Sequence, residues 1–314
     1  MVMAYSALRD EIEQQLQDTG NAEFTTAEID LWIAQGLREL SNYKPHIVRE
    51  TYTIESRIGT ATSTTAGSLI DATKSQFVSG DVGKIIFNDT DNTWAEIVTF
   101  TSATALVLSK DIMVSGEKYR MFNKECFSDL EINIEDIGDY IYVDNVEYPL
   151  NARRNFTMRG TDKLRLVLDT PPDDSNNTSS NVEVYVDFAK RHKLSQLTDF
   201  AGAVNNGAGY AAGSTSMAID ALNGSEVIEV DQEFTVAGVR GIYRVTTALT
   251  LSGGTGTLSA FYPGLESAVA DDDVVTFTQS TLDYEDERLV IDLITARALL
   301  NKLTKFATNI NVNA

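Results

Sequence analysis

Residue types that usually carry chemistry are scarce in this chain of 314 residues. Its one cysteine, Cys126, excludes an intrachain disulfide framework and a zinc site built from several cysteines. Its two histidines, His46 and His192, have the spacing of neither a metal site nor a catalytic triad. The glycine-rich segment at 253–256 lacks the lysine of a phosphate-binding loop, and there is no nucleophile elbow. The sequence therefore predicts no cofactor, no metal and no enzyme.

Long apolar runs and basic stretches are absent as well. No run approaches the roughly 18–20 residues that a membrane-spanning helix needs, and residues 1–5 lack the features of a secretory signal, so we expect no export and no membrane contact. The chain has 25 basic residues against 46 acidic ones, a net charge of −21. A surface of this sign repels DNA, so specific binding to a phosphate backbone is not expected.

Both ends of the chain show helical periodicity. Thr25 and Glu28 form a capping-box pattern in front of the second apolar stretch, and Pro45 is expected to end that helix. A third amphipathic helix is expected near the C-terminus, with acidic residues in its first turn. The residues predicted to form one core between these helices are Leu8, Ile12, Leu16, Trp32, Ile33, Leu37, Leu40, Leu289, Leu293 and Leu300.

Between the helical ends, the pattern favours strands. Two segments near 59–122 and 208–278 are similar: residues 68–72 read SLIDA where residues 217–221 read MAIDA. The predicted fold class is α+β: a helical bundle from the N-terminal helix pair and the C-terminal helix, an antiparallel middle, and two inserted small β-domains. The expected boundaries are 1–58 with 279–314 for the helical core, 59–122 for the first β-module, 123–200 for the antiparallel unit, and 201–278 for a Gly-rich linker with the second β-module.

Local patterns add two expectations. Asp144 and Asn145 separate two strand-like stretches and predict a two-residue hairpin turn. The acidic stretches at 125–139 and 271–273 lack the ligand spacing of a calcium loop. Solvated loops are the favoured interpretation of both stretches, and a divalent-ion site is the alternative.

Four segments carry a resemblance to a known family. Residues 5–12 (YSALRDEI) and 29–40 (IDLWIAQGLREL) resemble the opening helices of the head-to-tail adaptor, or connector, proteins in the neck of tailed bacteriophages. Residues 182–194 (VEVYVDFAKRHKL) and 283–290 (DYEDERLV) look like the last strand and the C-terminal helix of that family. The inserted modules are similar to small β-domains of phage neck and tail proteins.

The resemblance implies a structural virion protein, made in the cytoplasm of the host bacterium. Such adaptors form a homo-oligomeric ring, usually a dodecamer, which docks under the portal protein and is associated with viral genome packaging. The ring extends the DNA channel, through which DNA passes without specific binding, and it docks the next neck, nozzle or tail protein. Its helices form the ring wall, and the C-terminal segment often contacts the portal. Members of the family are often about half as long as this chain, so the resemblance supplies no role for the inserted modules.

Two other functions stay open. In a phage tail or fibre surface protein, the β-modules would bind carbohydrate or a receptor, with Trp94, Tyr210, Tyr243 and Tyr262 as stacking platforms. The competing interpretation places these aromatic side chains in the module cores. A phage lyase or hydrolase would need clustered acids in a cleft.

Overall fold

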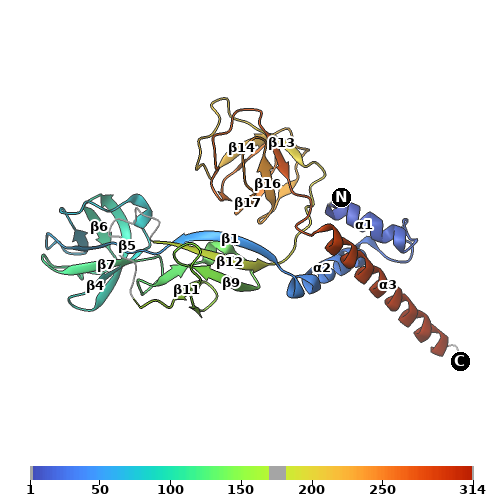
Figure 1. The fold of residues 1–314 in the computed structure, drawn as a ribbon, viewed down its shortest axis with the longest axis horizontal. Coiled ribbons are helices and arrows are strands. Elements are labelled where there is room, and N and C mark those ends of the chain that lie inside the picture. Colours follow the sequence, from blue (N-terminus) through green and yellow to red (C-terminus); the bar gives the residue numbers. More distant parts are fainter. Residues whose placement is uncertain (1–2, 170–181, 313–314) are drawn as a thin grey trace. The chain divides into compact units, whose positions relative to one another are not determined.

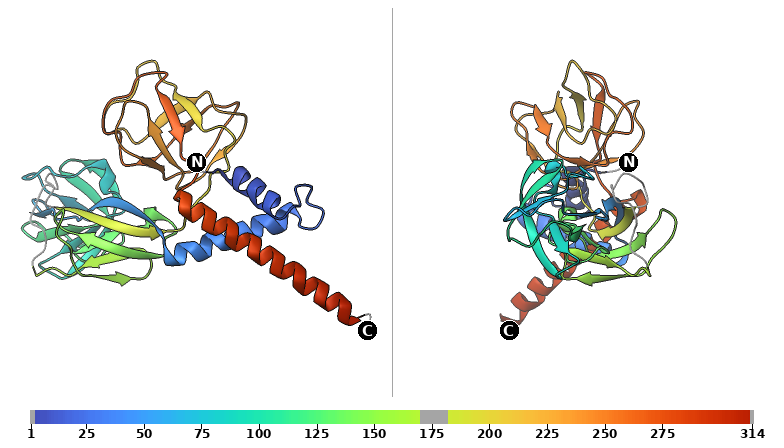
Figure 2. Two further views of the ribbon diagram at one scale, coloured as in Figure 1. Left: turned by 45° about the vertical axis from the view of Figure 1, so that its right-hand side comes forward. Right: turned by 90° about the vertical axis from the view of Figure 1, so that its left-hand side faces the viewer.

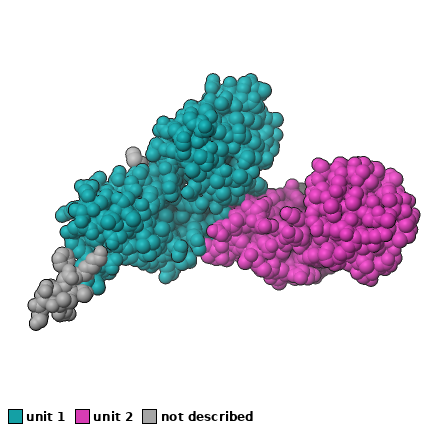
Figure 3. Space-filling view, turned by 180° about the vertical axis from the view of Figure 1, so that it is seen from behind, with its two compact units in different colours: residues 1–47, 189–314 teal, residues 48–188 magenta. Residues whose placement is uncertain are grey.

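The computed structural model describes residues 3–169 and 182–312, with side chains as far as residue 304. It is an α+β protein with helices at both ends and antiparallel sheets between them (Figure 1). The chain divides into two compact units, residues 1–47 with 189–314 and residues 48–188 (Figure 3). Residues 46–53, at the end of the segment 1–58 that was expected to belong with the helical core, form a strand.

The helices follow local signals in the sequence. They are α1 (Tyr5–Gln15), α2 (Thr26–Tyr43) and α3 (Tyr284–Val312). The capping box is present: Glu28 N donates to the Thr25 hydroxyl at 3.3 Å, and Thr25 N donates to the Glu28 carboxylate at 3.0 Å. Helix α2 ends before Pro45, which cannot continue it. The C-terminal half of α3 reaches past α1 and α2 (Figure 2).

The middle of the chain forms two three-stranded sheets. In sheet order, the strands are β1 (His46–Thr53), β12 (Glu183–Lys190) and β9 (Tyr142–Glu147), and then β10 (Phe156–Arg159), β11 (Lys163–Leu166) and β8 (Glu131–Asn133). Val184, Val186 and Phe188 lie on one face of β12 and are buried in one cluster with Leu164 and Ile132. The two sheets therefore share one core.

The hairpin in this region turns later than the sequence predicts. Strand β9 runs straight through Asp144 and Asn145, so the predicted turn is wrong. The Asn145 amide donates to both Glu147 and Asp187 at 3.1 Å, which holds it in the strand. The chain reverses instead after Tyr148, whose N–H donates to Ala152 O at 2.9 Å. Long-range partners of Asn145 thus override its local turn preference.

The first β-module is a six-stranded sheet. Its strands are β2 (Ile58–Thr60), β3 (Ser68–Ile70), β4 (Ile85–Asn88), β5 (Thr93–Ser102), β6 (Ala105–Leu108) and β7 (Lys118–Phe122), in the order β2-β7-β4-β5-β6-β3. Its first and last strands pair directly, Ile58 opposite Arg120. The two ends of the module therefore lie side by side, as an inserted domain requires.

The second β-module has a seven-stranded sheet and a small two-stranded one. Its strands are β13 (Ala201–Val204), β14 (Met217–Asp220), β15 (Val227–Ile228), β16 (Glu233–Val236), β17 (Tyr243–Val245), β18 (Leu249–Thr250), β19 (Gly256–Leu258), β20 (Phe261–Tyr262) and β21 (Val274–Phe277). The larger sheet has the order β19-β14-β13-β21-β16-β17-β20, and β15 pairs with β18. Here too the first and last strands pair, Ala201 opposite Thr276.

The two modules share a strand order. In the first module Thr62 N donates to Ile70 O at 2.7 Å, which brings β3 beside the end of β2. With β3 next to β2, the two ends of the order β2-β7-β4-β5-β6-β3 are joined, and the same order can be read from β6 as β6-β3-β2-β7-β4-β5. Read in this way, it corresponds to β19-β14-β13-β21-β16-β17 in the second module. The similar sequences at 68–72 and 217–221 fall on β3 and β14, which are equivalent strands. The sequence similarity is therefore matched by a common topology.

A buried ion network lies where the first module joins the middle of the chain. Arg57 binds Glu55 at 2.7 Å and Asp81 at 2.5 Å, and Lys84 binds the same two carboxylates. The side chains of Glu55, Arg57 and Asp81 are at most 5% exposed. Burial alone raises the pKa of Glu55, but Arg57 and Lys84 outweigh it and lower that pKa to about 2. No local pattern in the sequence indicates this network, because its members are separated by up to 29 residues.

Candidate functional site

The three helices meet in one apolar cluster. It takes in Leu8, Ile12 and Ile33, which are fully buried, as well as Leu16 and Trp32 at 8% exposure. Two further predicted residues, Leu37 and Leu40, are half-buried and pack against it. The N-terminal helices thus present to α3 the face that their periodicity predicts.

On α3, the buried face differs from the predicted one. The residues that enter the cluster are Val290, Ile291, Ile294 and Ala298. Gly36 lets α2 approach closely, because a Cβ atom there would stand 3.2 Å from Ile294. The predicted core positions Leu289 and Leu300 are exposed at 59% and 63% and lie outside the cluster.

Apolar residues lie on two neighbouring faces of α3, which explains the difference. One face packs inside the unit, and the other consists of Leu289, Leu293, Ala296, Leu300 and Leu303, which we call the α3 stripe. Its members recur at alternating intervals of four and three residues, the spacing of a helix that packs lengthwise against another helix. Leu303 is 64% exposed, and within the described part of the chain no element covers Leu289, Leu300 or Leu303.

A small hollow lies beside the N-terminal part of the α3 stripe. It has a volume of about 140 Å³ and is lined by Glu39, Leu40, Tyr43, Leu289, Val290 and Leu293. Tyr43, at the end of α2, is 84% exposed. An apolar cavity of about 150 Å³ can hold a benzene molecule, so this hollow has the size for one apolar side chain. The α3 stripe and the hollow together form the candidate interaction surface.

Ion pairs fix the helices that carry this surface. Lys44 binds Asp286 at 2.6 Å and Asp283 at 3.0 Å, which ties the end of α2 to the start of α3. Further along, Arg297 of α3 pairs with Glu39 of α2. The hydrogen bonds to Asp286 and Asp283 raise the pKa of Lys44, so it stays charged at neutral pH. The candidate interaction surface therefore lies on two helices, α2 and α3, that ion pairs hold together.

The two histidines are distant in the sequence but lie close together in the structure. Their ring centroids are 5.9 Å apart. His46 Nε2 lies 2.7 Å from a Glu233 carboxylate oxygen, and His192 Nε2 lies 2.9 Å from the Lys44 carbonyl oxygen. Burial lowers the pKa of His192, in spite of its hydrogen bonds to Lys44 and Thr281. His192 Nδ1 lies 3.1 Å from both the carbonyl oxygen and the hydroxyl of Thr281. Because burial favours the neutral ring, only one of the two ring nitrogens carries a proton to donate.

We expect residues 1–47 with 189–314 to lose stability as the pH falls below about 6.5. His192 binds a proton more readily in the unfolded chain, so its contribution is complete above that pH and is lost as the pH falls. Urea unfolding at pH 7.5 and 5.5, followed by Trp32 fluorescence in a Trp94→Phe background, measures the loss. His192→Gln should reduce the difference between the two pH values, and an unchanged difference would contradict this role for His192.

Two carboxylates of the 271–273 stretch and the single cysteine have structural roles. Asp271 accepts from Asn206 N at 2.7 Å, and Asp273 accepts from Ala270 N at 2.7 Å. Cys126 is buried, and burial raises its pKa to about 12. Among the residues that the structure describes, no group of three or more His, Cys, Asp or Glu is arranged to hold a metal ion.

The four aromatic residues of the receptor-binding alternative are not equivalent. Tyr243 is fully buried in the core of the second module, and the Tyr210 hydroxyl accepts from Ala218 N at 2.8 Å. Tyr262 is half-buried. Trp94 is 40% exposed, with Lys110 Nζ 3.9 Å from its ring centroid. Trp94 belongs to the first module, and the three tyrosines belong to the second.

Comparison with known proteins adds no relative, because no family model, curated protein or solved structure matches this chain. Within the described residues, no helix is both long and apolar enough to cross a membrane.

Proposed function

We propose that this chain is a structural protein of a tailed bacteriophage virion, a head-to-tail adaptor that forms a ring of about twelve copies under the portal. The ring extends the DNA channel and docks the next neck or tail component. The helices at the two ends of the chain form a bundle that builds the ring wall. The proposal rests on the family resemblance of residues 5–12, 29–40, 182–194 and 283–290, and one structural observation carries it.

That observation is the exposed α3 stripe. Leucines at 59–64% exposure along one line of a helix form an apolar surface that a monomer leaves in water. Their four-three spacing favours a second helix as the partner, since each leucine then fits between residues of the facing helix. A chain that presents such a stripe is suited to assembly with copies of itself.

The charges of α3 favour a staggered contact between copies. Residues 284–293 carry four carboxylates and one arginine, while residues 294–312 carry three bases and no acid. Arg297 and Lys302 pair with Glu39 and Glu23 of the same chain, so in the proposed contact the acidic half of a neighbouring α3 shares these two bases. The basic C-terminal half of one α3 complements the acidic N-terminal half of the next. In this arrangement Leu300 or Leu303 of one copy fits the hollow beside Leu289 of its neighbour, a heterologous contact that rotation can close into a ring.

The net charge of −21 is compatible with a DNA channel. A wall of the same sign as the phosphate backbone lets DNA move without adhering to it. The proposed role is mechanical and requires no reaction. The absence of a metal-binding group among the described residues therefore counts neither for nor against it.

Replacing Leu300 and Leu303 together with Arg should strongly weaken self-association. The change places two charges in the proposed contact, and the fold of the single chain should persist because both side chains are exposed. Mass photometry over a series of protein concentrations measures the assembled fraction, and the concentration needed for half-assembly should rise at least ten-fold. Val114→Arg, at a 50% exposed position in the first module, is the matched control. Equal assembly of all three proteins would contradict the contact.

Imaging of assembled virions tests the location of the protein. Density for this chain is expected as a ring between the capsid vertex and the tail. Density on fibres or on the capsid surface, away from the neck, would show the adaptor function to be wrong.

A further inference from the structure

A cleft lies where strands β9 and β10 separate. Each is an edge strand, β9 in the sheet β1-β12-β9 and β10 in the sheet β10-β11-β8. The two strands are joined by a hairpin. In it Arg154 N donates to Val146 O at 2.8 Å, and the backbones of Glu147 and Arg153 form an isolated antiparallel β-bridge. Beyond this point β10 pairs with β11 instead, and no described backbone hydrogen bond joins residues 142–145 to residues 156–159.

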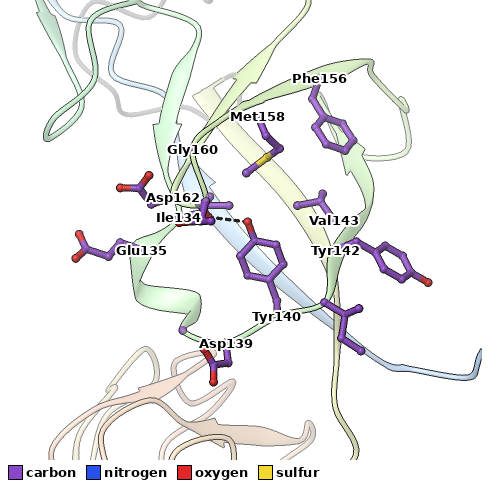
Figure 4. Close-up of a pocket in the computed structure, with 13 residues that line it drawn as sticks. Ile134, Glu135, Asp139, Tyr140, Tyr142, Val143, Phe156, Met158, Gly160 and Asp162 are labelled. Atoms are coloured by element: carbon purple, nitrogen blue, oxygen red, sulfur yellow. Dashed lines mark hydrogen bonds between the residues drawn. The ribbon is translucent and has the colours of Figure 1, made fainter. Parts of the chain in front are cut away.

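The cleft has a volume of about 750 Å³ and a largely apolar lining. Figure 4 shows the side chains of Met158 and Phe156 from β10 beside those of Val143 and Tyr140. Tyr140 is held in place, because its hydroxyl donates to Thr161 O at 2.6 Å and its ring contacts Phe188 with centroids 5.4 Å apart. Met158 is 36% exposed. The lining is therefore preformed and open to an incoming chain.

The charged side chains that line the cleft are all acidic. Glu135, Asp139 and Asp162 line it, and its described lining holds no Lys, Arg or His. Asp162 pairs with Lys163 at 2.6 Å, and this hydrogen bond lowers the pKa of Asp162, so that carboxylate is ionised at neutral pH. An occupant with positive charges complements this lining. A second copy of a chain with a net charge of −21 is the less suitable occupant.

Two unpaired strand edges favour an extended occupant. Each edge presents backbone N–H and C=O groups in a row, of which Asp144 O accepts from Arg153 Nη2 at 3.5 Å. An added strand can pair with the other groups while its alternate side chains enter the cleft. We infer that the cleft between β9 and β10 binds an extended, positively charged segment of another protein by strand addition. Its apolar side chains contact Val143, Phe156 and Met158, and its basic side chains reach Glu135 and Asp139. This site goes beyond the proposed ring and does not depend on it.

The test uses the full chain and synthetic peptides of about seven residues, a usual strand length. The first peptide alternates lysine and valine, the second alternates glutamate and valine, and the third is the first with a central proline, which cannot donate to a ladder. Isothermal titration calorimetry in 0.15 M salt measures the affinity. The lysine peptide is expected to bind at least ten-fold more tightly than either of the others.

Variants locate the binding in the cleft. Met158→Arg, and separately Glu135→Lys combined with Asp139→Lys, should each weaken the lysine peptide at least ten-fold. Val114→Arg, exposed in the first module and outside the cleft, should leave its affinity unchanged. No binding of the lysine peptide at about 1 mM, equal binding of the proline peptide, or equal loss in the Val114 control would each overturn the inference.

Discussion

Replacing Arg57 with Ala is expected to lower the free energy of unfolding of residues 48–188 by about 3–5 kcal/mol. The change leaves the carboxylates of Glu55 and Asp81 buried without their main partner, since both are at most 1% exposed. Lys84 still contacts both carboxylates, but it carries a single charge. Removing one member of a buried ion network costs more than the network contributes as a whole, because the charges left behind are not solvated.

The two tryptophans make this measurable in the full chain. Trp94 lies in the first module and Trp32 in α2, so a Trp32→Phe background reports the unfolding of residues 48–188 alone. Urea unfolding followed by Trp94 fluorescence then gives the free energy. Arg120→Ala is the matched control: Arg120 pairs with Asp89 and Asp129 but is 37% exposed, and its loss should cost about 1 kcal/mol or less. Similar losses of stability in both variants would contradict the prediction that the buried Arg57 network costs more to break than the exposed pairs of Arg120.

The same network predicts a dependence on pH. The folded-state pKa of Glu55 is about 2 and that of Asp81 is also lowered, so both carboxylates contribute stability that is present above about pH 4.5 and lost as the pH falls toward 2. The difference between the wild-type protein and Arg57→Ala should therefore be largest near neutral pH and should shrink in acid.

Ile294→Ala is expected to lower the stability of the unit that contains the helices by about 2–5 kcal/mol, whereas Leu300→Ala should change it by less than about 0.5 kcal/mol. Ile294 is fully buried against Gly36, and its removal leaves a cavity between α2 and α3. Leu300 is exposed and loses no contact within the chain.

Trp32 fluorescence in a Trp94→Phe background measures this pair of variants. The comparison is made at a protein concentration where the chain is monomeric, so that assembly through the α3 stripe does not contribute to stability. A larger effect for Leu300 than for Ile294 would mean that the sequence-predicted face of α3 is the true core.

The contrast between Ile294 and Leu300 shows which features of the fold can be predicted from the sequence. Capping at Thr25 and the end of α2 depend on neighbouring residues, and the sequence predicts both correctly. Helix α3 is apolar on two faces, and periodicity alone does not state which face meets α2. That choice depends on Gly36, whose missing side chain lets Ile294 approach.

Other features needed the folded chain because their residues are distant in sequence. His46 and His192 come close only when the end of α2 packs beside the segment that follows β12. The cleft at β9 and β10 has no sequence motif, since it arises from strands that stop pairing. Asn145 shows the opposite error, where a strong local turn signal is overruled by a contact with Asp187.

The pairing of each module's first and last strands has a mechanical consequence. A pull transmitted along the chain into the first module reaches β2 and β7 first, which are hydrogen-bonded neighbours, so the load passes across that pair instead of through the module. The second module is bypassed in the same way by β13 and β21. Under tension, each module should therefore stay folded until its first and last strands separate. Until then the other strands of each module bear no load.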